Sequence, residues 1–312
     1  MDKIKVLIVC SGNFNYLSPF IKEQTNSLIA LDVNIEFFFI KGKGALGYLK
    51  NLPLLKRKIK TFQPDLIHAH YGLSGMLAVL QRQIPVITTF HGCDVYSKKS
   101  NYYLSKIVER LSVYNIFVLD LLVKILKPTN KNYSIISCGI DIEKNIYIEK
   151  NEARNQLNLD KNKKYALFSG NYSDDRKNYT LAKQSIDIVE NIELIELKGY
   201  NREQVNLLMN AVDFIINTSK RETGPLVVKE AMACGCPIVT VDIGDVREVI
   251  GNTEGCCITS YDPNDIADKI KKVLIKNRRI NGRQRIIELE LDNDMVAAKI
   301  LKIYKNIINK SK

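Results

Sequence analysis

The residues with the most chemistry to offer lie between positions 219 and 240, where two glutamates flank a predicted helix start. Glu222 stands just ahead of that start, and Glu230 lies further along the helix. The N–H groups of Leu226 and Val227, in the first turn, have no partner within the helix and carry the positive end of its dipole. An amide-lined helix start of this kind is a binding site for a diphosphate.

Local residue choices predict the helix that holds these groups. Gly224 allows a tight turn, Pro225 suits the first helical position, and Gly235 stops the helix. Apolar runs at 213–216 and 238–241 predict buried strands before and after it. Because ligands of open parallel sheets bind beyond the carboxyl ends of the strands, the loop that carries Glu222 lies at the functional edge.

The same alternation of short apolar runs and helical patterns extends along the chain. Strands that are apolar throughout and separated by helices predict an α/β fold with doubly wound parallel sheets. The pattern pauses in an Asn- and Lys-rich stretch near 151–164 and then repeats, which favours two Rossmann-like domains. The predicted strands are 4–10, 33–40, 66–70, 86–90 and 115–118 in the first half, and 166–170, 192–197, 213–216 and 238–241 in the second.

The composition predicts a folded, cytoplasmic protein. The 312 residues are 46% hydrophobic and 26% charged, which is enough to bury full cores and argues against disorder. No apolar run approaches the roughly 20 residues of a membrane span, and the N-terminal run is too short for a signal peptide. Seven cysteines without a Cys-x-x-Cys pair predict reduced thiols rather than a disulfide or zinc framework.

The positive charge is concentrated in the first half. The net charge is +12, of which residues 1–150 carry +9 and the remainder +3. Seven basic residues and no acidic one lie between Lys41 and Lys60. A solvated face explains such a run, and contact with an anionic membrane or a lipid phosphate is the alternative. Nucleic acid is disfavoured because no basic motif with interleaved aromatic residues is present.

A glycine motif in the first half imitates a dinucleotide site. Gly42, Gly44 and Gly47 fit the pattern G-x-G-x-x-G, and Asp65 stands downstream at about the spacing of a ribose ligand. The motif follows the second predicted strand rather than the first, and Asp65 precedes its strand instead of following one. A dinucleotide cofactor is therefore not expected.

No metal site is predicted. Asp292 and Asp294 resemble an Asp-x-Asp metal motif, but Asp294 precedes a helical pattern and is expected to cap that helix. His68 and His70 are expected to point to opposite faces of their strand and so not to share a metal ion.

In this setting, Glu222 and Glu230, with seven residues between them, resemble the Glu-x7-Glu signature of family 4 glycosyltransferases. The following AMACGCP and DIGDVREVI segments are also similar to that family, and the first half is similar more loosely, through DLIHAH and FHGCD. The resemblance implies the GT-B fold, in which two Rossmann-like domains face one another across a cleft, and retention of anomeric configuration. It further implies an acceptor-binding domain at 1–155, a nucleotide-sugar-binding domain at 156–293, and a helix at 294–312 that packs back on the first domain.

The resemblance also implies roles for individual residues. Glu222, Lys177 and His91 are the expected catalytic residues, with Lys177 on the diphosphate and His91 reaching the donor sugar. Glu230 is expected to accept hydrogen bonds from the ribose hydroxyls. The other expected donor contacts are Arg176, Gly224, Pro225, Leu226 and Val227.

Two positions depart from the family pattern. An arginine usually stands six residues before the diphosphate lysine, where this chain has Asn171, so Arg176 or Arg221 would have to compensate. The loop after the first strand supplies one glycine, Gly12, followed by Asn13, and these two are the expected acceptor-side contacts.

The function implied is transfer of a sugar from a UDP- or GDP-sugar, without a catalytic metal or other cofactor. The expected acceptor is a glycan or a lipid-linked molecule in bacterial surface-polysaccharide synthesis, reached by peripheral contact with an anionic inner membrane face. Two alternatives remain: a nucleotide-sugar epimerase of the same fold, and a non-catalytic nucleotide-sugar-binding subunit that partners an active transferase.

Overall fold

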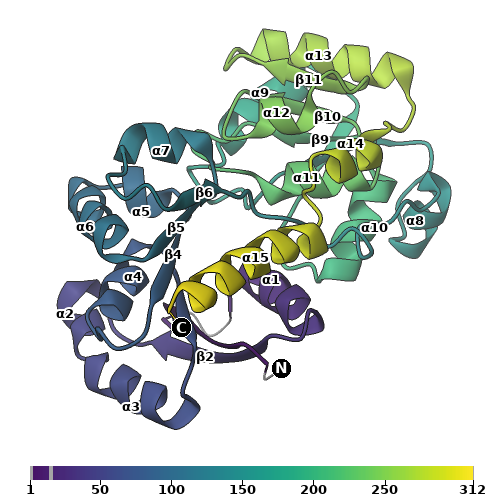
Figure 1. Cartoon of the computed structure of the whole chain (residues 1–312). Coiled ribbons are helices and arrows are strands. Elements are labelled where there is room, and N and C mark those ends of the chain that lie inside the picture. The colour runs from purple at the N-terminus through teal and green to yellow at the C-terminus, as the bar shows by residue number, and fades with distance from the viewer. Residues whose placement is uncertain (1–2, 14–16, 312) are drawn as a thin grey trace. The chain divides into compact units, whose positions relative to one another are not determined.

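The computed structural model describes residues 3–13 and 17–311, and the chain divides into two compact units. The first unit is Met1–Gly139 with Asn293–Lys312, and the second is Ile140–Asp292 (Figure 1). The division falls after Gly139 rather than at residue 155. Residues 140–155 belong to the second unit because helix α8 (Lys150–Gln156) is held there: the buried Arg154 guanidinium donates to the Ala211 carbonyl at 2.8 Å.

The first unit is a parallel six-stranded sheet in the order β2-β1-β3-β4-β5-β6, with helices on both faces. Strands β3 and β4 are buried along their whole length, as their continuous apolar runs require. The elements are β1 (Lys5–Ser11), α1 (Pro19–Ala30), β2 (Asn34–Ile40), α2 (Gly44–Leu49), α3 (Leu52–Phe62), β3 (Leu66–His70), α4 (Gly72–Val79), β4 (Val86–Phe90), α5 (Cys93–Tyr96), α6 (Lys99–Leu111), β5 (Tyr114–Phe117), α7 (Asp120–Leu126), β6 (Tyr133–Ile135) and α15 (Asn293–Ser311).

The second unit is a parallel five-stranded sheet in the order β11-β10-β9-β7-β8. Its elements are α8, β7 (Lys164–Phe168), α9 (Tyr179–Val189), β8 (Ile192–Glu196), α10 (Arg202–Ala211), β9 (Phe214–Asn217), α11 (Leu226–Ala233), β10 (Ile238–Val241), α12 (Val246–Ile250), β11 (Cys256–Thr259), α13 (Pro263–Lys276) and α14 (Gly282–Glu288). The predicted α/β class with two doubly wound parallel sheets is confirmed, and all nine predicted strands are present. The two strands that the sequence did not predict, β6 and β11, are short edge strands without a continuous buried run.

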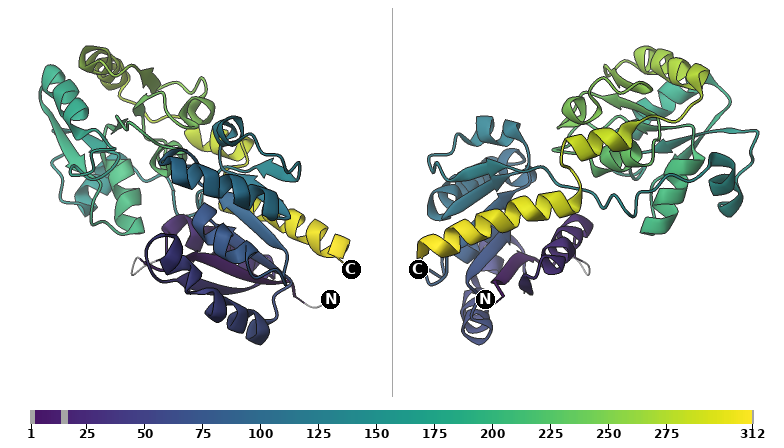
Figure 2. Two further views of the ribbon diagram at one scale, coloured as in Figure 1. Left: turned by 90° about the vertical axis from the view of Figure 1, so that its left-hand side faces the viewer. Right: turned by 45° about the vertical axis from the view of Figure 1, so that its right-hand side comes forward.

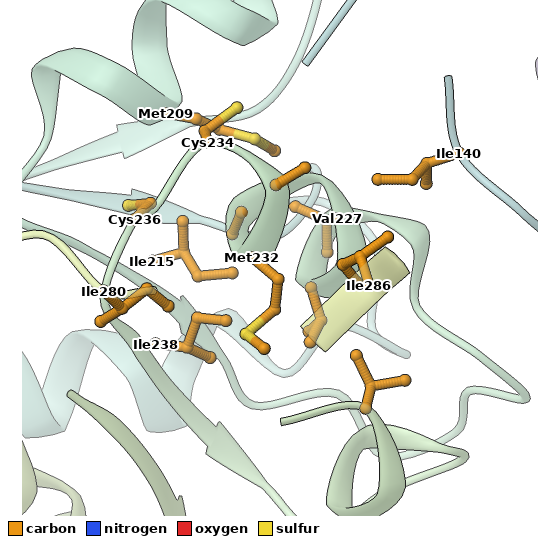
Figure 3. Close-up of a cluster of buried hydrophobic side chains, with 14 of the residues drawn as sticks. Ile140, Met209, Ile215, Val227, Met232, Cys234, Cys236, Ile238, Ile280 and Ile286 are labelled. Atoms are coloured by element: carbon orange, nitrogen blue, oxygen red, sulfur yellow. The ribbon is translucent and has the colours of Figure 1, made fainter. Parts of the chain in front are cut away.

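A packed apolar core fixes helix α11 against the second sheet (Figure 3). Val227 and Met232 of α11 meet Ile215 of β9 and Ile238 of β10, and α14 closes the far side. Helix α14 approaches so closely that a Cβ on its Gly282 would lie 2.6 Å from the Met232 carbonyl oxygen. Helix α11 is therefore held by packing on two sides.

The last helix, α15, is part of the first unit and packs against α1 (Figure 2). Its Val296, Ile300 and Tyr304 side chains are buried beside β1. The helix begins at Asn293, so Asp294 lies in its first turn and does not cap it as expected. Within the described residues, no helix is both long and apolar enough to cross a lipid bilayer.

Replacing Tyr304 by Phe tests how α15 is held. The Tyr304 hydroxyl and His68 Nδ1 form a buried hydrogen bond of 2.6 Å, and its loss leaves a buried ring nitrogen without a partner. We expect Tyr304→Phe to lower the free energy of unfolding by about 1–3 kcal/mol in urea denaturation. The control is Tyr103→Phe, since Tyr103 is 65% exposed and its replacement should change stability by less than about 0.5 kcal/mol. Equal effects from the two variants would contradict this role of Tyr304.

Candidate functional site

The carboxyl ends of three strands in the second unit are joined through one buried amide. Asn217, the last residue of β9, accepts hydrogen bonds at Oδ1 from Ser169 Oγ at 2.8 Å and from Ser219 Oγ at 2.7 Å. Its Nδ2 donates to Thr240 Oγ1 of β10 at 3.1 Å. This network ties β7, β9 and β10 together and fixes where the loop from Thr218 to Pro225 leaves the sheet.

That loop lies directly against the loop that follows β10, and glycines make the contact possible. A Cβ on Gly224 would lie 2.8 Å from Asp245 Oδ2, and a Cβ on Gly244 would lie 2.5 Å from the Thr223 carbonyl oxygen. Gly244 also has φ +61°, a left-handed conformation that favours glycine. Gly224 is therefore needed for a close approach between loops as well as for a turn.

A buried ion pair joins helix α11 to the loop that follows β10. Lys229 Nζ of α11 lies 2.8 Å from Asp245 Oδ2, and the two side chains are 0% and 5% exposed. Removing one partner of a buried pair leaves an uncompensated charge, which costs about 3–5 kcal/mol. The pair therefore holds the start of α11 firmly beside the sheet edge.

Lys177 and Glu222, which are 45 residues apart in sequence, meet at this edge. Lys177 Nζ lies 2.5 Å from Glu222 Oε1, and each side chain is about one-fifth exposed. The lysine stem runs over Gly170, where a Cβ would lie 2.7 Å from Lys177 Cγ. The Thr218 hydroxyl donates to the Lys177 and Asn178 carbonyls at 3.1 and 3.0 Å. Both the backbone and the side chain of Lys177 are thus held in place.

Helix α11 carries the remaining predicted donor residues. Pro225 is the residue before the helix, and Leu226 and Val227 are its first two residues, so their N–H groups lie in the first turn. Glu230 is about one turn further along, is 5% exposed, and forms an ion pair with Arg202 at the start of α10. Arg202 is the first residue of α10, after the N-cap Asn201, and its pairing with Glu230 across the fold was not predicted from the sequence.

Arg176, Asn171 and Arg221 are the positions that bear on the arginine missing from the family pattern. The Arg176 side chain is 75% exposed and forms an ion pair with Asp174 at 2.8 Å. The Asn171 side chain accepts a hydrogen bond from the Ser173 backbone N–H at 2.9 Å and shapes the turn before Lys177. Arg221 is exposed. Lys177 is the residue of this region that forms an ion pair with Glu222 at 2.5 Å.

In the first unit, His91 belongs to a buried histidine cluster at the ends of β3 and β4. Its Nε2 lies 3.0 Å from His70 Nδ1, and its ring packs against Tyr71 and Phe20. His68 bonds Tyr304 and, at 2.7 Å, Thr89 Oγ1. The expectation that His68 and His70 point to opposite faces is wrong: residues two apart on a strand share a face, and these rings stack with centroids 4.6 Å apart.

The cluster has no metal-binding geometry. Across the described parts of the chain, no group of three or more His, Cys, Asp or Glu residues could hold a metal ion. Burial lowers the pKa of His70 to about 3 and holds the pKa values of His68 and His91 well below their usual range, so all three rings are neutral at pH 7.

Asp94 is a residue in this region whose role the sequence did not reveal. Its buried carboxylate accepts hydrogen bonds from the backbone N–H groups of Gly72 at 3.0 Å, Gly92 at 2.7 Å and His91 at 3.1 Å. It therefore joins the loops after β3 and β4 and fixes the backbone of His91. Burial raises its pKa to about 6 against the opposing effect of these N–H groups.

The predicted acceptor-side residues are both used in building the fold. Gly12 donates its N–H to the Ile40 carbonyl at 2.8 Å, and a Cβ there would lie 2.7 Å from Phe39 Cβ. The Asn13 side chain pairs with both the N–H and the carbonyl of Gly42, at 2.8 and 2.7 Å. The glycine motif that begins at Gly42 makes this turn after β2, where Gly42 has φ +116°.

The histidine cluster predicts instability in acid. The unfolded chain takes up protons on these histidines near pH 6.5, whereas the folded protein does so only at much lower pH. The free energy of unfolding should therefore fall below pH 6.5, by up to about 1.4 kcal/mol per pH unit for each histidine. Asp94, with a raised pKa, opposes this trend by at most one proton between roughly pH 4 and 6.

Urea denaturation from pH 7.5 to 5.0 measures this slope. His70→Gln should reduce the slope of the unfolding free energy against pH by the equivalent of about one proton. Substitution of the exposed Lys271 should leave that slope unchanged. A stability that is constant from pH 7 to 5.5 would contradict the neutral, buried state of the cluster.

Comparisons with known proteins agree with this architecture. A family model described as "Glycosyl transferases group 1" matches residues 182–289, and one described as "Glycosyltransferase Family 4" matches residues 7–144. A Bacillus subtilis protein named as a teichuronic acid biosynthesis glycosyltransferase, TuaC, is 25% identical over 243 residues, which cover 69% of this chain and 62% of that protein. This chain therefore spans about three-fifths of the length of that relative.

A second relative resembles about a third of the chain, and a solved structure aligns with nearly all of it. The N,N'-diacetylbacillosaminyl-diphospho-undecaprenol alpha-1,3-N-acetylgalactosaminyltransferase of Campylobacter jejuni is 31% identical over 114 residues, covering 35% of this chain and 30% of that protein. The structure of Anabaena Alr3699/HepE in complex with UDP and glucose aligns with a TM-score of 0.78 at 14% identity, covering 97% of this chain and 100% of that one. The two sheets and the two family matches, one in each unit, lead to one conclusion: the chain belongs to the family 4 glycosyltransferases and has the GT-B fold.

Proposed function

We propose that the chain transfers a sugar from a nucleoside diphosphate sugar with retention of anomeric configuration and without a catalytic metal. The observation that carries this proposal is the contact of Lys177 with Glu222 beside the start of α11. A cation, a carboxylate and unpaired first-turn amides are the groups needed to bind a diphosphate next to a hydroxylated sugar.

The proposed chemistry rests on the charge of the leaving group. Cleavage of the bond between the sugar and the phosphate leaves additional negative charge on the nucleoside diphosphate, and fixed donors lower the barrier by stabilising it. Lys177 and the amides of Leu226 and Val227 would supply this stabilisation. Glu222 would then release Lys177 to the phosphate and accept hydrogen bonds from the sugar, while Glu230 accepts them from the ribose. His91 would contact the donor sugar.

The relatives support the choice of substrates. The name of the Campylobacter enzyme specifies a diphospho-undecaprenol acceptor, the Bacillus name specifies teichuronic acid synthesis, and the Anabaena structure contains UDP and glucose. We extend these to a UDP- or GDP-sugar donor and to a glycan or lipid-linked acceptor in surface-polysaccharide synthesis.

Turnover by a Lys177→Ala variant tests the proposal. Thermal stabilisation by UDP, GDP, ADP and their sugars first identifies the donor, since a ligand of the native state raises the apparent stability. Loss of one preorganised donor to the leaving group costs about 2.7–4 kcal/mol, so kcat should fall by roughly a hundredfold or more.

Lys183→Ala is the matched control, because Lys183 lies exposed on α9 and forms an ion pair along its own helix with Asp187. A near-normal rate for Lys177→Ala would remove Lys177 from the mechanism. Formation of a new nucleotide sugar from donor alone would identify an epimerase instead.

The surface of α2 and α3 supports peripheral contact with a membrane. Its basic residues are largely exposed, and the same two helices carry three exposed leucines: Leu46 at 77%, Leu54 at 54% and Leu49 at 41%. Exposed apolar and basic side chains on one surface favour binding to an anionic bilayer, because the leucines can insert into the interface while the lysines contact the anionic headgroups. This surface would hold the first unit at the inner membrane face, near a lipid-linked acceptor.

Flotation with vesicles measures this contact. Binding should rise with the fraction of anionic phosphatidylglycerol, and the double variant Lys43→Glu/Lys50→Glu should weaken it by roughly tenfold or more, since each lysine contributes about 1 kcal/mol. Lys271→Glu, on the second unit, should bind as the unmodified protein does. Binding that is independent of the anionic lipid content would count against membrane contact.

A further inference from the structure

The first unit contains a pocket at the point in its parallel sheet where the order of strand addition reverses. Strand β1 lies between β2, which follows it in the chain, and β3, which comes later. The connections from β1 and β3 leave in opposite directions, and the crevice between their carboxyl ends is where open α/β sheets bind ligands. A cavity of about 330 Å³ lies there, lined by Cys10 and Ser11 at the end of β1 and by Tyr71 just after β3.

The volume suits one small ring. Ligand pockets span about 300–1,000 Å³, so this cavity lies at the lower end and fits a single sugar unit better than an oligosaccharide. Leu17, Ile21, Leu73 and Leu104 form apolar walls.

Apart from the carboxylate of Asp94, the polar oxygen and nitrogen groups of the pocket's side chains are neutral hydroxyls and an amide. They include the side chains of Ser18, Tyr71, Ser74 and Asn101. The Ser18 hydroxyl makes no capping hydrogen bond to α1, and Asn101 Nδ2 donates to Ser97 Oγ at 3.1 Å. No lysine, arginine or histidine is among the described residues that line the cavity.

The single carboxylate in the lining is already engaged. Asp94 directs its two oxygens to the backbone N–H groups of Gly72, Gly92 and His91. Asp94 therefore holds two walls of the pocket together. As a carboxylate, it does not attract an anionic ligand.

We infer that this pocket binds the uncharged terminal sugar ring of the acceptor, and that it rejects a ring or small acid carrying a carboxylate or phosphate. This inference rests on the proposed function, since it specifies the acceptor of that transferase. A sugar presents hydroxyls to the serine, tyrosine and asparagine side chains and C–H surfaces to the leucines. An anion in the same place loses its water without gaining a cationic partner, which is unfavourable.

A matched pair of ligands tests the inference without any need for turnover. Octyl glucoside and octyl glucuronide differ only in a neutral hydroxymethyl group and a carboxylate. Saturation-transfer NMR with the full chain and no donor should show contacts to the ring protons of the glucoside, and the glucuronide should bind at least roughly tenfold more weakly. L-malate, a small dianion, should not compete with the glucoside.

Two variants locate the binding. Asn101→Arg places a cation at the pocket and should shift the preference toward the glucuronide by roughly tenfold or more, whereas Ser100→Arg, on the exposed side of the same helix, should not. Leu73→Trp fills the cavity and should abolish glucoside binding while leaving the thermal stabilisation by nucleoside diphosphate unchanged.

Equal or tighter binding of the glucuronide by the unmodified protein would overturn the inference. Glucoside binding that survives Leu73→Trp, or no binding of either glycoside, would also overturn it. Failure of nucleoside diphosphates to stabilise the chain would instead contradict the proposed donor site, which lies in the other unit, and the two failures are therefore distinguishable.

Discussion

The ion pair between Lys177 and Glu222 is the interaction on which the account of the second unit depends. A lysine close to the carboxyl end of β7 meets a glutamate just before α11 only because the intervening elements fix both backbones. Gly170 leaves room for the lysine stem, and Thr218 holds the lysine carbonyl. Under the proposed function, this partly buried pair would keep a cation beside the first-turn amides of α11 until a phosphate replaced the carboxylate.

The surrounding residues make the position of this pair rigid. The Asn217 amide joins three strand ends, and the buried pair of Lys229 with Asp245 joins α11 to the loop that follows β10. The apolar core in Figure 3 packs the same helix against the second sheet. A preorganised arrangement matters for transfer chemistry because donors that are already fixed need no reorganisation as charge develops on the leaving group.

The sequence predicted the parts of the fold that follow from local patterns. Continuous apolar runs predicted β3, β4, β7 and β9, and the end of α11 before Gly235 was also correct, whereas the helix starts one residue after Pro225 rather than at it. Patterns of this kind do not specify edge strands such as β6, or the boundary after Gly139, which depends on tertiary contacts of α8 with the second sheet. The family resemblance identified Glu222 and Lys177 as candidate site residues but did not predict the ion pair between them. The ion pair of Arg202 with Glu230, the brace at Asp94 and the stacked histidines arise from long-range packing, which spacing along the chain does not reveal.

A crystal structure of the chain with a bound nucleoside diphosphate tests the central claim most directly. We predict that phosphate oxygens lie within hydrogen-bond distance of Lys177 Nζ and of the N–H groups of Leu226 and Val227, with the ribose hydroxyls on Glu230. A diphosphate bound away from the start of α11, with Lys177 still paired to Glu222, would contradict the account.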